Sequence, residues 1–123
     1  MKKILALFIA LICLTGLAET PASELRHIVA LKFKSEATPE QIKKIESAFR
    51  ELKSKIPQVV SLEWGTNVSV DQRNKGFTHC FVLSFKSDND LKTYADSSEH
   101  KSFVAILRPV MEDVFVFDFW SQH

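Results

Sequence analysis

The fold is decided by Val114-Phe115-Val116-Phe117-Asp118-Phe119-Trp120, a predicted strand that is apolar on both faces. Successive side chains of a strand point to opposite faces of a sheet, so the three phenylalanines share one face. The two valines, Asp118 and the final tryptophan share the other. One layer of helices covers only one face, and monomers rarely leave a large apolar patch exposed. The pattern predicts that Phe115, Phe117 and Phe119 lie in the interface of a homodimer.

The rest of the chain alternates strand-like and helical segments. Strand-like runs, rich in β-branched and aromatic residues, cover residues 26–33, 60–68 and 77–85. A long helix is expected between the first two runs, and two short helical stretches follow the third, separated by a break at Ser97-Ser98. The order is therefore βαββαβ. It predicts an α+β, ferredoxin-like antiparallel sheet with its helices on one face.

The long helix has the clearest sequence signals. Thr38-Pro39-Glu40-Gln41 combines a capping threonine, a proline at the first helical position and a glutamine that completes a capping box. Apolar residues then recur at alternating spacings of three and four, which places them on one helical face. They are Ile42, Ile45, Phe49, Leu52 and Ile56. Pro57 ends the helix.

The N-terminus predicts a secretory signal peptide over residues 1–22. Met1-Lys2-Lys3 is a short basic start, Ile4–Leu17 is an apolar run, and small residues allow cleavage after Ala18 or Ala22. The apolar run is shorter than the roughly 20 residues that a membrane-spanning helix needs. We therefore expect export to the periplasm or the medium, with no stable membrane anchor after cleavage.

Residues 23–123 are expected to form one small domain. Cleavage after Ala18 removes two of the 16 basic residues and none of the 15 acidic ones, which leaves the mature chain close to neutral. This balance gives no electrostatic reason to expect a nucleic-acid partner. Cys80 is the single cysteine of the domain, so no internal disulfide stabilises it. Stability must come from packing or from a partner subunit.

Three histidines lie near the starts of strands or helices, and histidine exchanges protons near neutral pH. His27 and His79 begin two predicted strands, and His100 follows Tyr94 by six residues. In neighbouring antiparallel strands His27 and His79 should be offset by roughly 10–15 Å. This offset, without an HExxH, CxxC or carboxylate cluster, predicts no metal site. Each histidine could equally be a cap or a buried structural residue, and Tyr94 a half-buried amphipathic one.

Motifs spread between Glu24 and Trp120 occur in an order that is typical of one family. They are Arg26–Phe33, Ile56-Pro57, Leu62–Gly65, Gly76–His79, Phe85–Ser87, Asp90–Tyr94, His100–Val104, Arg108-Pro109 and Phe117–Phe119. Over these segments the chain resembles the stress-responsive A/B barrel domain (Dabb) family of dimeric α/β barrels. One departure is Ser98-Glu99-His100, where the family usually has His-Pro-x-His.

The resemblance implies a homodimer with a cavity between the sheet and the helices. A few members of the family are polyketide cyclases that use a tyrosine–histidine pair. Those catalytic roles would fall on Tyr94 and His100, with His27 and His79 lining the ligand pocket. Most members lack a defined reaction. Export would be unusual, since many relatives look cytoplasmic.

Three functions stay open at this point. The first is an exported homodimer with an apolar small-ligand pocket and no established reaction. The second is a cofactor-free, cyclase-like enzyme in which His100 acts as a base beside Tyr94 on an apolar carbonyl compound. The third is a heme- or quinone-linked monooxygenase-like enzyme, because such enzymes share this barrel. An open cavity shared by Tyr94 and His100 would favour a site, and a sealed core there would favour a non-enzymatic protein.

Export is directly testable. Because the basic start and apolar run form a signal peptide, expression in a secreting host should remove about 18–22 residues. Mass spectrometry of the mature N-terminus measures the cleavage position. A soluble product that still carries Met1 would contradict the expectation.

Overall fold

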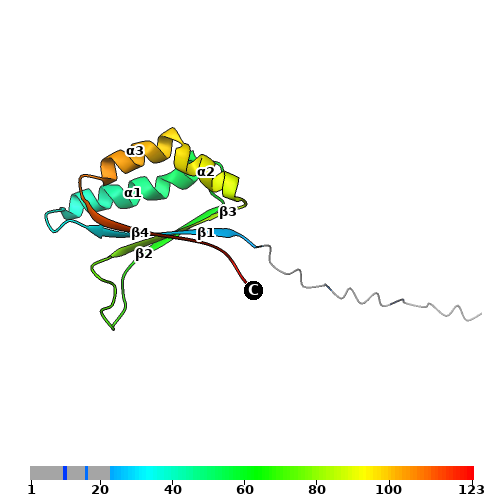
Figure 1. Ribbon diagram of the computed structural model, residues 1–123, viewed down its shortest axis with the longest axis horizontal. Helices are drawn as coiled ribbons and strands as arrows, with labels where there is room; N and C mark the ends of the chain where they lie inside the picture. Colours follow the sequence, from blue (N-terminus) through cyan, green and yellow to red (C-terminus); the bar gives the residue numbers. More distant parts are fainter. Residues whose placement is uncertain (1–9, 11–15, 17–22) are drawn as a thin grey trace, which may run out of the picture.

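The computed structural model describes Ala10, Gly16 and residues 23–123, so the predicted signal peptide, residues 1–22, otherwise lies outside the described residues. Within these residues the chain forms β1 (Leu25–Phe33), α1 (Pro39–Lys55), β2 (Ser61–Thr66), β3 (His79–Phe85), α2 (Asp88–Asp96), α3 (Ser98–Leu107) and β4 (Met111–Trp120). The strands make one antiparallel sheet in the order β2-β3-β1-β4. The helices all cover the same face of it (Figure 1). The predicted α+β, ferredoxin-like fold is confirmed.

Strand ends differ from the sequence expectation where pairing, rather than side-chain alternation, decides them. β4 begins at Met111, earlier than the apolar run that starts at Val114. Its first residues pair with the end of β1, Met111 opposite Phe33 and Asp113 opposite Lys32. The backbone hydrogen bonds of the ladder therefore extend β4 through a polar stretch that does not look like a strand.

The start of α1 has the predicted capping box. The hydroxyl of Thr38 accepts a hydrogen bond from the backbone N–H of Gln41 at 3.2 Å, and the Gln41 side chain accepts one from the Thr38 N–H at 2.9 Å. Two of the backbone donors at the helix end are thereby satisfied. The helix ends at Lys55, with Ile56 as its C-cap and Pro57 beyond.

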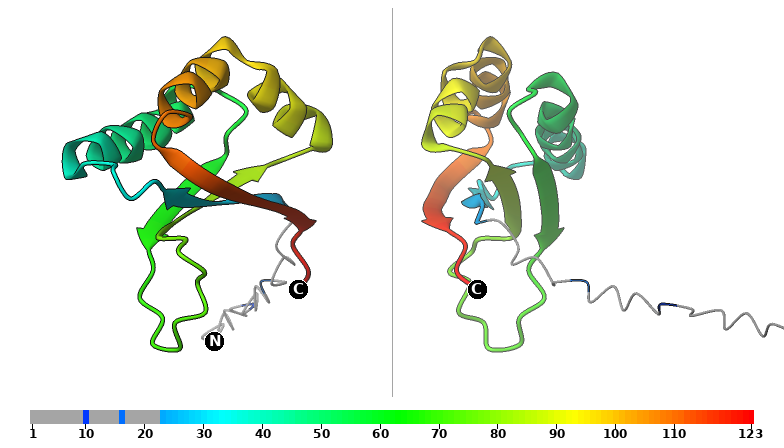
Figure 2. Two further views of the ribbon diagram at one scale, coloured as in Figure 1. Left: turned by 60° about the vertical axis from the view of Figure 1, so that its left-hand side comes forward. Right: turned by 90° about the vertical axis from the view of Figure 1, so that its right-hand side faces the viewer.

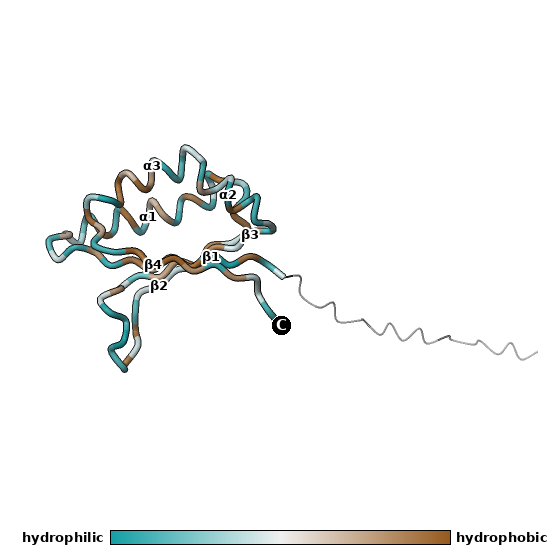
Figure 3. The backbone as a smooth tube through the Cα atoms, viewed as in Figure 1, coloured by the Kyte–Doolittle hydropathy of each residue, from teal (hydrophilic) through white to brown (hydrophobic). Residues whose placement is uncertain are grey.

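The core lies between the sheet and the helices, and its centre is an aromatic stack. Phe49 of α1 lies parallel to Phe81 of β3 with ring centroids 3.9 Å apart, and Phe103 of α3 packs against Phe49 at 4.8 Å. Burying a phenylalanine side chain contributes about 1.5–3 kcal/mol, so this cluster fixes α1 and α3 on the sheet. Figure 3 shows hydrophobic residues along the strands and alternating with hydrophilic ones along the helices.

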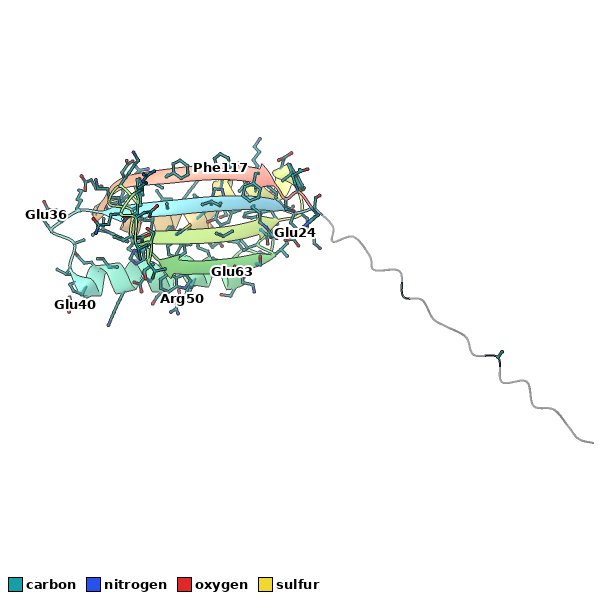
Figure 4. All side chains as sticks on the ribbon, turned by 90° about the horizontal axis from the view of Figure 1, so that it is seen from below. Glu24, Glu36, Glu40, Arg50, Glu63 and Phe117 are labelled. Carbon is teal, nitrogen blue, oxygen red and sulfur yellow. The ribbon has the colours of Figure 1, made fainter. Side chains whose placement is uncertain are left out.

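The opposite face of the sheet has no helices over it. On β4 the three phenylalanines point to this outer face, as the alternation predicts, and they pair with Arg26, Ile28 and Ala30 of β1. Phe115, Phe117 and Phe119 are 51%, 53% and 39% exposed. Figure 4 views the sheet from this side, with Phe117 on its outer surface. The large apolar patch expected from the sequence is therefore present.

The loop between β2 and β3, residues 67–78, projects from the sheet on the side opposite the helices (Figures 1 and 2). Gly76 has a φ of 81°, a backbone conformation that residues with a side chain rarely adopt, so glycine suits this turn. Val68 and Val70 are almost fully exposed on the loop. Within the described part of the chain, no helix is both long and apolar enough to cross a membrane.

Candidate functional site

A cavity of about 330 Å³ lies between the sheet and the α2–α3 layer. Its wall is mainly apolar and includes Val29, Phe49, Leu91, Phe103, Val114 and Val116. Four of its lining residues carry polar or charged groups: His27, Tyr94, His100 and Arg108. An apolar hollow with a few convergent polar groups is typical of a small-molecule site, and this volume is at the lower end of the usual range.

Ser97 holds Tyr94 and His100 together. It is at once the C-cap of α2 and the N-cap of α3. Its hydroxyl donates to the Tyr94 carbonyl at 2.7 Å and accepts from the backbone N–H of His100 at 3.1 Å. The two rings lie 4.8 Å apart, centroid to centroid. The break expected at Ser97-Ser98 is therefore confirmed, and Ser97 caps both helices in a chain that lacks the family's usual proline there.

The imidazole of His100 is held in one tautomer. Its Nδ1 lies 3.1 Å from the Ala95 carbonyl oxygen, which can only accept, so Nδ1 carries the proton and Nε2 has a free lone pair. Burial lowers the pKa of His100, and the nearby His27 lowers it further, while the bond to Ala95 opposes both effects. His100 is therefore neutral at pH 7, with Nε2 able to accept a proton.

Tyr94 has the complementary character. It is 1% exposed, and burial raises the pKa of its phenol well above the usual range, so the hydroxyl stays protonated. Its ring packs against Phe85 at 5.2 Å and His27 at 6.0 Å. Among the described residues, the Tyr94 hydroxyl has no hydrogen-bond partner. No fully buried side-chain nitrogen or oxygen of these residues lacks a partner, so this hydroxyl is not fully buried. Tyr94 also lines the cavity, so a ligand there is the candidate partner of this hydroxyl.

His27 faces the same cavity from the sheet. It pairs in register with Asp118 of β4, and its Nδ1 lies 2.5 Å from an Asp118 carboxylate oxygen. A carboxylate accepts, so Nδ1 donates to it and the second ring nitrogen is left for the cavity. The sequence does not by itself place Asp118 in the site. Asp118 stands out as the one charged residue in the otherwise apolar stretch Val114–Trp120. Its partner, however, follows only from the register of the strands.

His79 lies elsewhere. It pairs with Leu31, four residues along β1 from His27, which corresponds to about 13 Å at 3.3 Å per residue. Its two ring nitrogens are bonded to Glu46 at 3.0 Å and Thr78 at 2.8 Å. The structure thus brings together Tyr94, His100 and His27, and it places His79 outside their cavity. No group of three histidine, cysteine or acidic side chains in the described residues is arranged to hold a metal ion.

The fold and the cavity define a class of protein: a two-layer α+β domain with an apolar pocket between sheet and helices, lined by proton-donating and proton-accepting side chains. The chain belongs to the stress responsive A/B barrel domain (Dabb) family, whose sequence profile matches residues 25–121. The family resemblance predicted from the sequence is confirmed.

Two proteins 28% identical to the chain have enzyme names. Olivetolic acid cyclase from Cannabis sativa aligns over 94 residues, which cover 76% of this chain and 93% of the cyclase. The structure of a hydroxynitrile lyase from Passiflora edulis superposes with a TM-score of 0.77, covering 83% of this chain and 96% of the lyase. A dimeric ferredoxin-like protein of unknown function from Thermobifida fusca, 20% identical, has a TM-score of 0.71 over 85% of this chain and 96% of its own. This last likeness shows the fold alone.

Proposed function

We propose that the protein is an exported homodimer whose cavity binds a small apolar carbonyl compound, and that Tyr94 and His100 transfer a proton on the carbon beside that carbonyl. The observation that carries the proposal is that a proton donor and a proton acceptor lie next to each other on the apolar wall of one cavity. Tyr94 offers a free hydroxyl proton, and His100 offers a free Nε2 lone pair. Enolisation of a carbonyl compound needs one group of each kind.

The steps follow from these two atoms. The Tyr94 hydroxyl donates a hydrogen bond to the carbonyl oxygen, and Nε2 of His100 takes a proton from the adjacent carbon. The resulting enolate either regains that proton or adds to a second carbonyl of the same molecule, whose oxygen then receives the proton from His100. His27, oriented by Asp118, faces the same cavity, where its second ring nitrogen is available for a hydrogen bond with the ligand.

The enzyme names of the two relatives at 28% identity support a catalytic use of this cavity. A protein that only binds its ligand is the second candidate. It is favoured by the tight packing of Tyr94 among Phe85, His27 and His100, since an aromatic cluster of this kind also serves structure. The two candidates differ in whether a proton leaves the bound carbonyl compound.

Proton transfer can be measured with 4-phenyl-2-butanone in D2O, by following the loss of its α-proton signals by NMR. The wild-type protein should accelerate exchange, and His100→Ala should reduce the acceleration by about 10²–10⁴-fold because it removes the base. Because the pKa of His100 is lowered, the rate should rise with pH and reach half its plateau below about pH 6.5, the ordinary histidine value.

The matched control is His123→Ala, which removes an exposed histidine at the chain end that does not line the cavity. Tyr94→Phe should slow exchange while leaving the ring packing in place. If wild type binds the ketone without accelerating exchange, the protein is a binder. Equal acceleration by wild type and His100→Ala would also sink the catalytic role.

The outer face of the sheet supports the homodimer. Its phenylalanines form one continuous row, with Phe115 and Phe117 stacked at 6.4 Å and Phe117 and Phe119 tilted at 6.2 Å. The β2–β3 loop, which is largely polar but exposes Val68 and Val70, projects on the same side of the sheet, where it can reach a second copy (Figure 2). Two sheets meeting on this face would cover both rows. The neighbour from Thermobifida fusca is described as dimeric, which supports assembly as a dimer.

A charge on this face should break the dimer. Phe117→Asp places a carboxylate at the centre of the proposed interface, where burial without a partner is costly, so the variant should be a monomer or aggregate. Light scattering after size exclusion measures the mass. Ile106→Asp, an equal change at an exposed position of α3, should remain dimeric. A wild-type protein that is monomeric at micromolar concentration would rule out the interface.

A further inference from the structure

Arg108 is an exposed residue at the edge of the cavity, and among the lining residues it is the one with a fixed charge. The other ionisable groups on the described wall are the imidazoles of His27 and His100 and the phenol of Tyr94. Each of these groups can be neutral, whereas a guanidinium is always charged. Arg108 follows the last residue of α3 and caps that helix through its backbone N–H, which donates to the Val104 carbonyl at 3.0 Å. That cap uses backbone atoms alone. The side chain is therefore free for another role.

No carboxylate in the described residues lies within ion-pair distance of Arg108. Asp118, on the sheet beside the cavity, is bonded to His27. Glu99 of α3 lines a different hollow with Ala48 and Leu52 of α1, so it faces away from the cavity. An exposed arginine without an ion pair, at the edge of an apolar cavity, can bind an anion that enters from outside.

A second hollow of about 350 Å³ adjoins the cavity at this point. The two share Ala95, His100, Val104 and Arg108, and the hollow adds Lys101. His100 and Arg108 thus stand where the apolar interior meets a surface with two cations. A molecule that spans this boundary would have its apolar body inside, its reactive carbonyl at His100 and its polar end at Arg108.

We propose that Arg108 binds a carboxylate at one end of the ligand, so that the substrate class is an apolar carbonyl compound that carries a carboxylate. This inference rests on the proposed function in that it takes the cavity as the ligand site. Guanidinium and carboxylate match as two parallel hydrogen bonds, which fixes the orientation of the bound molecule as well as its charge. The apolar body then extends from Arg108 toward Val29 and Val116 of the sheet.

The test uses two probes of nearly equal shape, 4-butylbenzoate and its neutral amide, 4-butylbenzamide. Isothermal titration of the wild-type protein should show the benzoate binding about 10-fold or more tightly than the amide, since a hydrogen bond to a charged group contributes more than a neutral one. Arg108→Gln should weaken benzoate binding by about the same factor and leave amide binding unchanged. Arg108→Lys should keep part of the preference, because it keeps the charge and loses the fork.

The matched control is Lys101→Gln, which removes a cation from the same helix at a position that borders the outer hollow and does not line the cavity. It should retain the preference for benzoate. Equal binding of the two probes by wild type, binding of neither, or an equal loss of both in Arg108→Gln would overturn the proposal. Proton exchange on the neutral ketone needs no anion, so a failure of this inference and a failure of the proposed catalysis are separate results.

Discussion

A last strand that is largely apolar on both faces, in a sheet with helices on only one side, is the constraint on which this structure depends. The helical side must fill its space, and it does so unevenly. α1 and α3 pack closely through the stack of Phe49, Phe81 and Phe103, whereas the break between α2 and α3 leaves a cavity beside that stack. The other face of the sheet keeps an exposed row of phenylalanines. The cavity and the dimer surface therefore lie on opposite sides of the same strands, and β1 and β4 line both.

Much of the fold could be predicted because its signals are local. The capping box of α1, the alternation along β4 and the order of the elements are each read within a few residues. The closeness of Tyr94 and His100 could also be predicted, since the two residues flank the helix break. Asp118 was missed because alternation gives the face of a side chain and not its partner across the sheet. The position of His79 is not predictable for the same reason, since it depends on the register that places His79 opposite Leu31.

The chemistry of the site follows from its backbone as much as from its side chains. The Ala95 carbonyl selects the tautomer of His100, and the Ser97 hydroxyl joins the helix that carries Tyr94 to the helix that carries His100. Burial raises the pKa of Tyr94 and lowers the pKa of His100, because it disfavours the charged form of each ring. It keeps the phenol protonated and the imidazole neutral. A proton donor and a proton acceptor are thereby held side by side at neutral pH.

The most direct test of the central claim is the protonation of His100 in the free protein. Long-range proton–nitrogen NMR correlation of the imidazoles at pH 7 should show His100 neutral, with its proton on Nδ1 and an unprotonated Nε2. Adding 4-phenyl-2-butanone should shift the Nε2 resonance of His100 and leave both ring nitrogens of His79 unchanged. A His100 that is charged at pH 7, that carries its proton on Nε2, or that does not respond to the ketone would contradict the account.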